Sequence, residues 1–332
     1  MLELDGSDGG GQLVRTALAL SAVSGTPFEM VNIRGDRPNP GLGHQHFTAV
    51  RALAEIAAAD VSEVEVGDEE LTFEPETVAG GEYEADIGTA GSITLLFEAL
   101  LPLAPALPEP LTLWATGGTD VKWSPPLDYF RYVKLPFLRR HGLHAAVELD
   151  RRGFYPKGAG RVGLQLAPSS VEQFAATDRE GGPARIYSVA SANLATQDVA
   201  ERQADEAARR IEAAGVATIE RSVTYAEAAS AGTAIVVRLD GPPAGFTALG
   251  ERGVPAEEVA GKAVDATLAF RDGPGAVDEH MADQLVPWLA LSGGRVRIPR
   301  VTDHVETVVN LVSEFGYEVA LDRRDEGAVL EG

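Results

Sequence analysis

A glycine-rich turn that leads into a helix pattern opens the chain, in the stretch DGSDGGGQLVRTALAL. Gly9, Gly10 and Gly11 let the backbone approach a ligand closely, and the spacing of the apolar residues behind them predicts a helix from about Gln12. Free N–H groups and the positive end of the helix dipole would make this turn an anion site, with Arg15 one turn into the helix. Taken alone, the stretch is explained equally well by a flexible turn, since no P-loop or dinucleotide fingerprint fits.

Arginine side chains gather in the same part of the chain. Arg34 and Arg37 follow a predicted strand in a loop rich in glycine and proline, where binding residues tend to lie. The guanidinium group can hold a phosphate through two parallel hydrogen bonds. Arg51 lies inside a predicted helix, where a surface ion pair explains it as well as a ligand does.

Four of the six histidines lie at or just before predicted helix starts: His44, His46, His280 and His304. The helix dipole disfavours the cationic imidazole there, so such a histidine stays a neutral nucleophile near pH 7 beside a place that favours phosphate. For any one of them alone, a surface histidine is the simpler interpretation. The chain has no cysteine and no H-E-x-x-H spacing, which excludes thiol chemistry and argues against a zinc site.

Composition points to a large core and an unusual surface. The chain has 332 residues, 45% of them hydrophobic, and a net charge of −22. Its acidic residues are spread evenly and lysine is scarce beside arginine, a pattern that favours adaptation to high salt, where screening shortens the reach of charge. No apolar run is long enough to span a membrane, and the start, MLELDG, does not resemble a signal peptide, so we expect a cytoplasmic protein with no membrane partner.

Three copies of one unit position these residues. Each copy starts with a small-residue turn that enters an apolar helix, and continues with a strand, a second helix and two strands. We therefore predict an α/β (α+β) fold whose main body, residues 1–182 and 273–332, holds three βαβαββ-type units. Residues 169–183 are predicted to be a polar linker between the second and third copies. Residues 183–272 are predicted to form a small inserted α/β domain, whose charged helix near residues 198–214 is a solvated face.

Several long motifs, in order along essentially the whole chain, resemble the RNA 3′-terminal phosphate cyclase family. They are LDGSDGGGQLVRTALALSAVSGTPF, NIRGDRPNPGLGHQHFTAV, IGTAGSITLLFEALLPLA, ATGGTD, RRGFYPKGAGRV, DEHMADQLVPWLAL and TDHVETVVNL. Enolpyruvyl transferases repeat a similar unit, but they need a site rich in lysine and arginine that the few lysines of this chain do not supply.

The resemblance implies a ligase that uses ATP and Mg²⁺ or Mn²⁺ on RNA 3′-phosphate ends. A histidine is adenylated, AMP passes to the RNA 3′-phosphate, and the neighbouring 2′-OH displaces it to leave a 2′,3′-cyclic phosphate. The alternative is a non-catalytic relative that serves ribosome assembly and lacks the nucleophile. His304 and the HMADQ segment favour the enzyme.

The resemblance also implies roles for individual residues. The nucleophile is His304, and a metal ligand is Asp8. Nucleotide contacts fall on His280, Met281, Ala282, Asp283, Gln284 and Glu98. Phosphate and RNA contacts fall on Arg15, Arg34, Arg37, His44, Gln45 and His46. Three of these positions depart from the common family pattern, which has Glu at Asp8, Gln at Glu98 in bacterial members and Arg at His44.

Overall fold

The first repeat is built around the helix that follows the N-terminal glycine turn. The computed structural model describes residues 1–179, 181–241 and 244–332. In it the first repeat comprises β1 (Leu2–Asp5), α1 (Gly11–Ser24), β2 (Phe28–Val31), α2 (His44–Ile56), β3 (Asp60–Val61) and β4 (Leu71–Glu74). The strands form a sheet in the order β1-β2-β4-β3, with β1 parallel to β2 and the other pairs antiparallel. Both helices begin within two residues of the predicted positions.

The second repeat has the same strand plan, in the order β5-β6-β8-β7. The helix predicted from residue 127 is present, but a π-helical segment interrupts it. Its elements are β5 (Gly81–Asp86), α3 (Ile93–Leu100), η1 (Leu101–Ala106), β6 (Leu111–Gly117), α4 (Leu127–Tyr129), η2 (Phe130–Lys134), α5 (Leu135–Arg140), β7 (Ala145–Arg151) and β8 (Gly160–Leu166). A single π-helical turn inside an α-helix is often found at functional sites.

The third repeat starts earlier than predicted. Its elements are β9 (Phe174–Ala176), α8 (Glu279–Gln284), α9 (Val286–Ser292), β14 (Gly294–Ile298), α10 (Asp303–Glu314), β15 (Ala320–Arg323) and β16 (Ala328–Glu331). The order β15-β16-β14-β9 repeats the plan once more, with β9 parallel to β14. The prediction of an unbroken polar linker over residues 169–183 is therefore wrong. Phe174 and Ala176 are buried in the main core, and this burial holds a short strand in a polar stretch.

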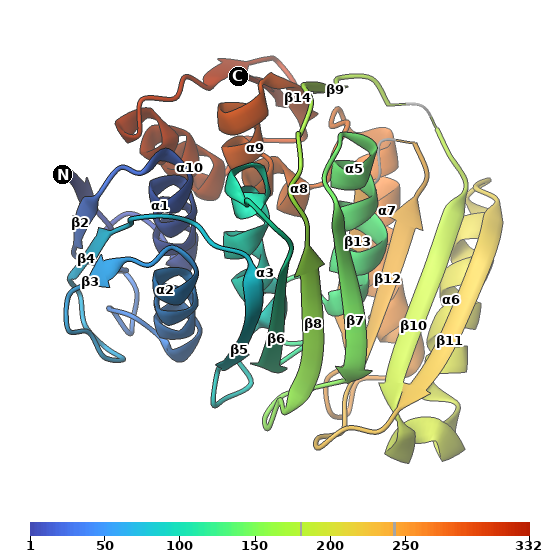
Figure 1. The fold of residues 1–332 in the computed structure, drawn as a ribbon. Coiled ribbons are helices and arrows are strands. Elements are labelled where there is room, and N and C mark those ends of the chain that lie inside the picture. Colours follow the sequence, from blue (N-terminus) through green and yellow to red (C-terminus); the bar gives the residue numbers. More distant parts are fainter. Residues whose placement is uncertain (180, 242–243) are drawn as a thin grey trace.

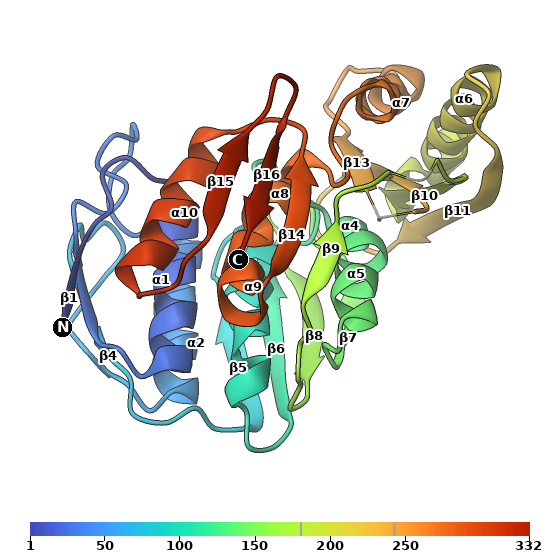
Figure 2. The same cartoon turned by 90° about the horizontal axis from the view of Figure 1, so that it is seen from above.

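A fourth sheet lies between β9 and α8, so it interrupts the third repeat instead of separating two copies. Its elements are β10 (Ala184–Ser191), η3 (Ala192–Gln197), α6 (Val199–Ala213), β11 (Thr218–Ala226), β12 (Thr233–Leu239), β13 (Ala244–Leu249) and α7 (Ala256–Asp272). The strand order is β11-β10-β12-β13, and both helices cover one face (Figure 2). Ile186, Ile235 and Val264 belong to a hydrophobic cluster separate from the main core.

The helices of the repeats share one core. Seen from above, α1, α2 and α10 lie together beside the sheet of the first repeat (Figure 2), and α1 contacts α2, α3 and α10. The fourth sheet lies at the opposite side of the molecule (Figure 1). It is joined to the body by Tyr187, whose ring stacks on Tyr132 at 4.1 Å between centroids. The protein has an α+β fold in which three units of one strand plan bring helix starts from both ends of the chain together.

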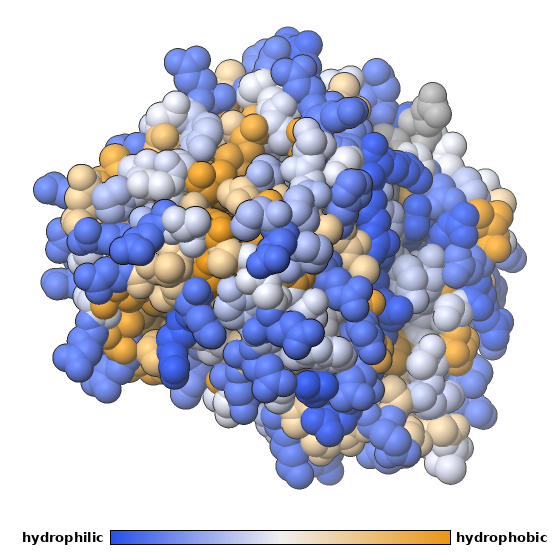
Figure 3. Space-filling view, viewed as in Figure 1, coloured by the Kyte–Doolittle hydropathy of each residue, from blue (hydrophilic) through white to orange (hydrophobic). Residues whose placement is uncertain are grey.

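The face of the molecule seen in Figure 3 is largely polar, and hydrophilic side chains cover most of it. Within the part of the chain that the structure describes, no helix is both long enough and apolar enough to cross a membrane. A cytoplasmic location stays a prediction.

Candidate active site

The glycine turn at the start of α1 is shaped around His46. A Cβ built on Gly11 would lie 1.8 Å from His46 Nε2, so only glycine leaves room for the imidazole. The backbone N–H of Gly43 donates to His46 Nδ1 at 3.1 Å, and this bond places the proton of the neutral ring on Nε2. Burial, helped by the charges of Arg15 and Arg34, lowers the pKa of His46 to about 3. His46 therefore presents a neutral N–H donor beside the helix start.

Three predicted arginines gather at the same turn. Burial lowers the pKa of Arg15 to about 10, against the opposing charge of Asp283. The Arg34 guanidinium donates to Gly41 O at 2.7 Å, and burial together with the charge of Arg37 lowers its pKa. Arg37 lies 3.4 Å from a Cβ built on Gly10, at the head of α1. Like charges held together in this way favour an anion between them.

His304 lies at the start of α10, as predicted. Thr302 caps the helix by accepting from Val305 N at 3.3 Å. The His304 side chain is half exposed, and its Nδ1 lies 3.4 Å from Asp283 Oδ2 in α8. The Gln12 amide donates to Thr307 Oγ1 at 3.4 Å, and that hydroxyl donates to His304 O at 3.2 Å. The N-terminal parts of α1 and α10, almost 300 residues apart in sequence, are thus joined by a side-chain hydrogen bond.

The HMADQ segment forms α8 and is fixed by a carboxylate that sequence reasoning missed. Asp278, buried, caps the helix by accepting from the N–H groups of His280 at 2.9 Å and Met281 at 3.0 Å. It also accepts from Gly245 N and from the Tyr129 hydroxyl, each at 2.8 Å. These bonds tie α8 to β13 and to the second repeat. Met281 and Ala282 pack in the core, so their side chains do not face solvent, whereas Asp283 and Gln284 reach other site residues.

A second residue that the sequence did not reveal is Lys134, in the π-helical turn. It is fully buried, forms an ion pair with Glu98, and donates to Gln284 Oε1 at 3.2 Å. Burial holds the pKa of Lys134 well below its usual range. The carboxylate of Glu98 is thus contacted from inside the protein by a buried amino group. The signal in the sequence was a lysine among apolar helix residues in a chain that has only four lysines.

The remaining predicted site residues make fewer hydrogen bonds and ion pairs with other site residues. His44, the first residue of α2, and Asp8, in the glycine turn, are both exposed. Among the described residues, no three His, Cys, Asp or Glu side chains gather to hold a metal ion. Mg²⁺ is commonly held by one or two carboxylates together with phosphate oxygens, and Asp8 fits that role. Gln45 Nε2 is buried and has no hydrogen-bond partner within the described chain.

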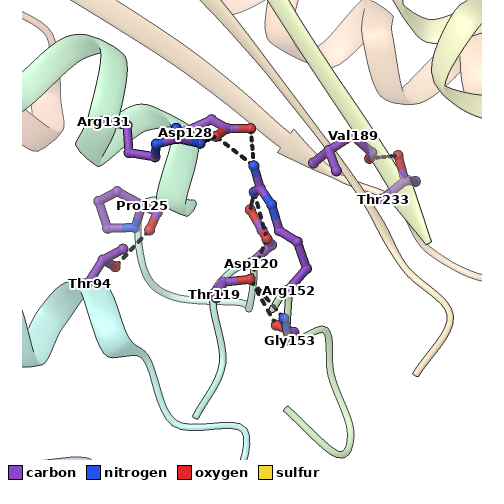
Figure 4. A network of polar contacts seen from close by, with 10 residues as sticks. All are labelled: Thr94, Thr119, Asp120, Pro125, Asp128, Arg131, Arg152, Gly153, Val189 and Thr233. Atoms are coloured by element: carbon purple, nitrogen blue, oxygen red, sulfur yellow. Dashed lines mark hydrogen bonds and ion pairs between the residues drawn. The ribbon is translucent and has the colours of Figure 1, made fainter. Parts of the chain in front are cut away.

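Two loops of the second repeat are joined by a buried ion network (Figure 4). Arg152, at 4% exposure, donates to both oxygens of Asp120 at 3.1 and 3.0 Å and to both oxygens of Asp128 at 2.6 and 2.7 Å. Burial alone would lower the pKa of Arg152, but the two carboxylates outweigh it and raise that pKa. Both residues of the first pair lie in motifs of the family resemblance, yet their pairing was not predicted.

Comparison with known proteins identifies the family of the chain. Residues 7–319 match the family model described as RNA 3′-terminal phosphate cyclase. Proteins of that name from three archaea are similar to the chain. The one from Halobacterium salinarum is 51% identical and covers 98% of both chains. Those from Pyrococcus furiosus and Methanosarcina barkeri are 41% and 39% identical, cover 95% of this chain, and are matched over 93% and 94% of their own lengths.

The chain therefore belongs to the RNA 3′-terminal phosphate cyclase family, a family of ligase-class enzymes. The similarity to a protein from a halophilic archaeon agrees with the salt adaptation expected from the acidic composition.

Proposed function

We propose that the protein converts an RNA 3′-phosphate to a 2′,3′-cyclic phosphate at the expense of ATP, through an adenylate on His304. The observation that carries the proposal is the position of this imidazole. It is half exposed at the N-terminus of α10, with Nδ1 facing Asp283 and with the α1 turn hydrogen-bonded to the same helix. Asp283 favours the tautomer with the proton on Nδ1, which leaves the lone pair of Nε2 free to attack.

In the first step, His304 Nε2 bonds to the α-phosphorus of ATP while the bond to pyrophosphate breaks. Negative charge then builds on the departing oxygens, where Arg15, Arg34 and Arg37 together with the N–H groups of α1 can stabilise it. In the second step, an oxygen of the RNA 3′-phosphate displaces the imidazole. In the third, the vicinal 2′-OH bonds to the 3′-phosphorus, loses its proton, and AMP leaves.

Mg²⁺ or Mn²⁺ would neutralise charge on the triphosphate and on pyrophosphate as it leaves. Asp8 is the residue we expect to hold it, because this exposed carboxylate lies in the turn that precedes the phosphate-facing helix. The neutral Nε2–H of His46 and the Gln45 Nε2 group, which has no partner among the described residues, are donors suited to phosphate oxygens nearby.

The nucleotide is proposed to contact α8 and the residues around it. His280 packs edge-on against Tyr129 at 5.6 Å between ring centroids, which leaves its ring fixed beside the helix. Asp283 and Gln284 lie on the same short helix, and Gln284 receives its hydrogen bond from Lys134. Glu98, held in place by that lysine, is proposed to face the adenine base.

The division of the chain also remains a proposal. We assign residues 1–182 and 273–332 to the catalytic body and residues 183–272 to an inserted domain. The separate sheet and hydrophobic cluster of the insert support this division.

The test is covalent labelling. The protein is incubated with α-labelled ATP and Mg²⁺ or Mn²⁺ at high salt, and the modified peptide is mapped. We expect the label on His304, no adduct with His304→Ala, and a reduced but detectable adduct with His280→Ala. A label on the His280 peptide, or full labelling of His304→Ala, would overturn the assignment. No adduct in the wild-type protein would favour the non-catalytic relative that serves ribosome assembly.

A further inference from the structure

Two aromatic side chains of the second repeat project into solvent. Trp123, in the loop after β6, is 96% exposed, and Tyr155, in the loop after β7, is 70% exposed. Most large apolar side chains of the described chain are buried or half-buried, and leaving an indole almost fully in water gains nothing for folding. The backbone of Trp123 is also held at a φ of 63°, which is rare for a bulky residue.

Positive charge accompanies both aromatics. The chain has only four lysines against a net charge of −22. Lys134 is buried, whereas Lys122 directly precedes Trp123 and Lys157 follows Tyr155 by two residues. Lys122 keeps its side chain more than half exposed while it lies 3.1 Å from Glu251. Half of the lysines in an acidic protein thus flank its two most exposed described aromatic side chains.

The two loops are rigidly joined beneath these side chains. Arg152 connects Asp120 to Asp128 through the buried network of Figure 4. Thr119 N donates to Gly153 O at 2.8 Å, and Gly153 N donates to Thr119 Oγ1 at 3.0 Å. The backbone beneath the two exposed rings is therefore fixed, which lowers the conformational entropy lost when the rings bind a ligand.

The inserted segment also packs against these two loops. Phe154, next to Tyr155 in the chain, is buried against Val189 and Ala234 of the fourth sheet. A bridge between Asp120 and Phe154 keeps the two loops in register.

The two loops that carry Trp123 and Tyr155 border the candidate active site. A Cβ built on Gly158 would lie 2.7 Å from Ala90 Cα, and one built on Gly118 would lie 2.5 Å from Ala90 O. In the same segment, a Cβ on Gly91 would lie 3.2 Å from the Cβ of Gln45. Only the segment around Ala90 thus separates the loops from a residue assigned to phosphate binding.

We propose that Trp123 and Tyr155, flanked by Lys122 and Lys157, form a stacking platform for the bases of single-stranded RNA that precede the 3′-phosphate. The proposal rests on the proposed function for the identity of the RNA end. Every base has a face that can stack on an aromatic ring, and such contacts accept many sequences. Stacking also persists in salt that weakens contacts between lysine and phosphate, which suits a protein with this acidic surface.

The experiment compares Trp123→Ala and Tyr155→Ala with Trp123→Phe and with Ile219→Ala. Ile219 is a matched control, since it is 53% exposed but lies in β11 of the insert. Binding of a single-stranded RNA of about ten nucleotides with a 3′-phosphate is measured without ATP. Loss of a base stack should weaken binding about 5- to 100-fold for each alanine variant. Trp123→Phe should retain most of the affinity, and Ile219→Ala all of it.

Kinetics separate this role from a structural one. Each alanine variant should raise KM for the long RNA and leave kcat, the yield of labelled adduct and KM for a dinucleotide 3′-phosphate unchanged. Unchanged RNA binding in the Trp123→Ala, Tyr155→Ala double variant would overturn the platform and favour a protein partner for this surface. Loss of adduct in the same variants would also overturn it, by assigning the loops a structural role. A wild-type protein that binds RNA through Trp123 but forms no adduct would refute the proposed function alone.

Discussion

Replacing Gly11 by alanine should displace His46 and so test the geometry of the proposed phosphate site. The added Cβ would lie 1.8 Å from His46 Nε2, 2.5 Å from Cδ2 and 2.8 Å from Cε1, whereas ordinary contacts begin at 3.4 Å. The imidazole must therefore retreat by roughly 1.6 Å, and interiors packed at crystal-like density give such room only at a cost. The retreat would break the hydrogen bond from Gly43 to Nδ1.

The stability cost follows from these contacts. Overpacking costs about 1–3 kcal/mol and the lost hydrogen bond about 1 kcal/mol. The better helix propensity of alanine offsets up to about 1 kcal/mol. We expect Gly11→Ala to lower the free energy of unfolding by about 1–3 kcal/mol. Because a displacement on the order of 1 Å can cost a hundredfold in rate, cyclisation of a labelled RNA 3′-phosphate should slow by about that factor.

Denaturant unfolding of a double-mutant cycle checks the cause. In a His46→Ala background the imidazole is absent, so Gly11→Ala should cost little or even stabilise α1. Gly261→Ala serves as a control, because its Cβ would meet only the guanidinium of Arg210 and should leave activity unchanged. Equal destabilisation by Gly11→Ala in both backgrounds, or wild-type cyclisation by the single variant, would refute the reasoning.

Three further outcomes are expected. His46 is protonated below about pH 6.5 in the unfolded chain but only below about pH 3 in the folded protein. The free energy of unfolding should therefore rise with pH between these values by about 1.4 kcal/mol per pH unit. Urea titrations of the wild type and of His46→Gln at several pH values measure this contribution. Lys134→Met should destabilise by up to about 3–5 kcal/mol, since it leaves the Glu98 side chain, only 13% exposed, without its partner, and adding Glu98→Gln should recover part of the loss in the same assay. Melting temperature should rise with KCl as the excess carboxylates are screened, and a steady fall would contradict salt adaptation.

Local pattern predicted most of the elements, because helices such as α1 and α10 carry apolar residues at helical spacing and begin at recognisable turns. The strand β9 was missed because only two buried side chains, Phe174 and Ala176, hold it in a polar stretch. Their burial depends on β14, which lies far along the chain. The pattern of residues within the segment carries no information about that partner strand.

The same limit applies to the candidate site. The histidines at helix starts and the arginines in the loop could each be selected as candidates, since each lies in a recognisable local sequence pattern. The partners of Lys134 and Tyr129 could not be identified, because Gln284 and Asp278 lie 150 and 149 residues away. An unusual buried polar residue can be noticed in a single sequence, but the distant partner that satisfies it is supplied only by the fold.

The insertion within the third repeat also fixes the order in which the enzyme can be assembled during synthesis. Phe174 of β9 pairs with Gly294 of β14, so the first strand emerges from the ribosome roughly 120 residues before its neighbour, or about 6–24 seconds at ordinary elongation rates. The first two sheets have all their strands long before then. The helix α10, with His304, meets α1 only when translation is nearly complete. A stalled or truncated chain that ends before α10 therefore lacks the proposed nucleophile, even though every residue of the glycine turn has already been made.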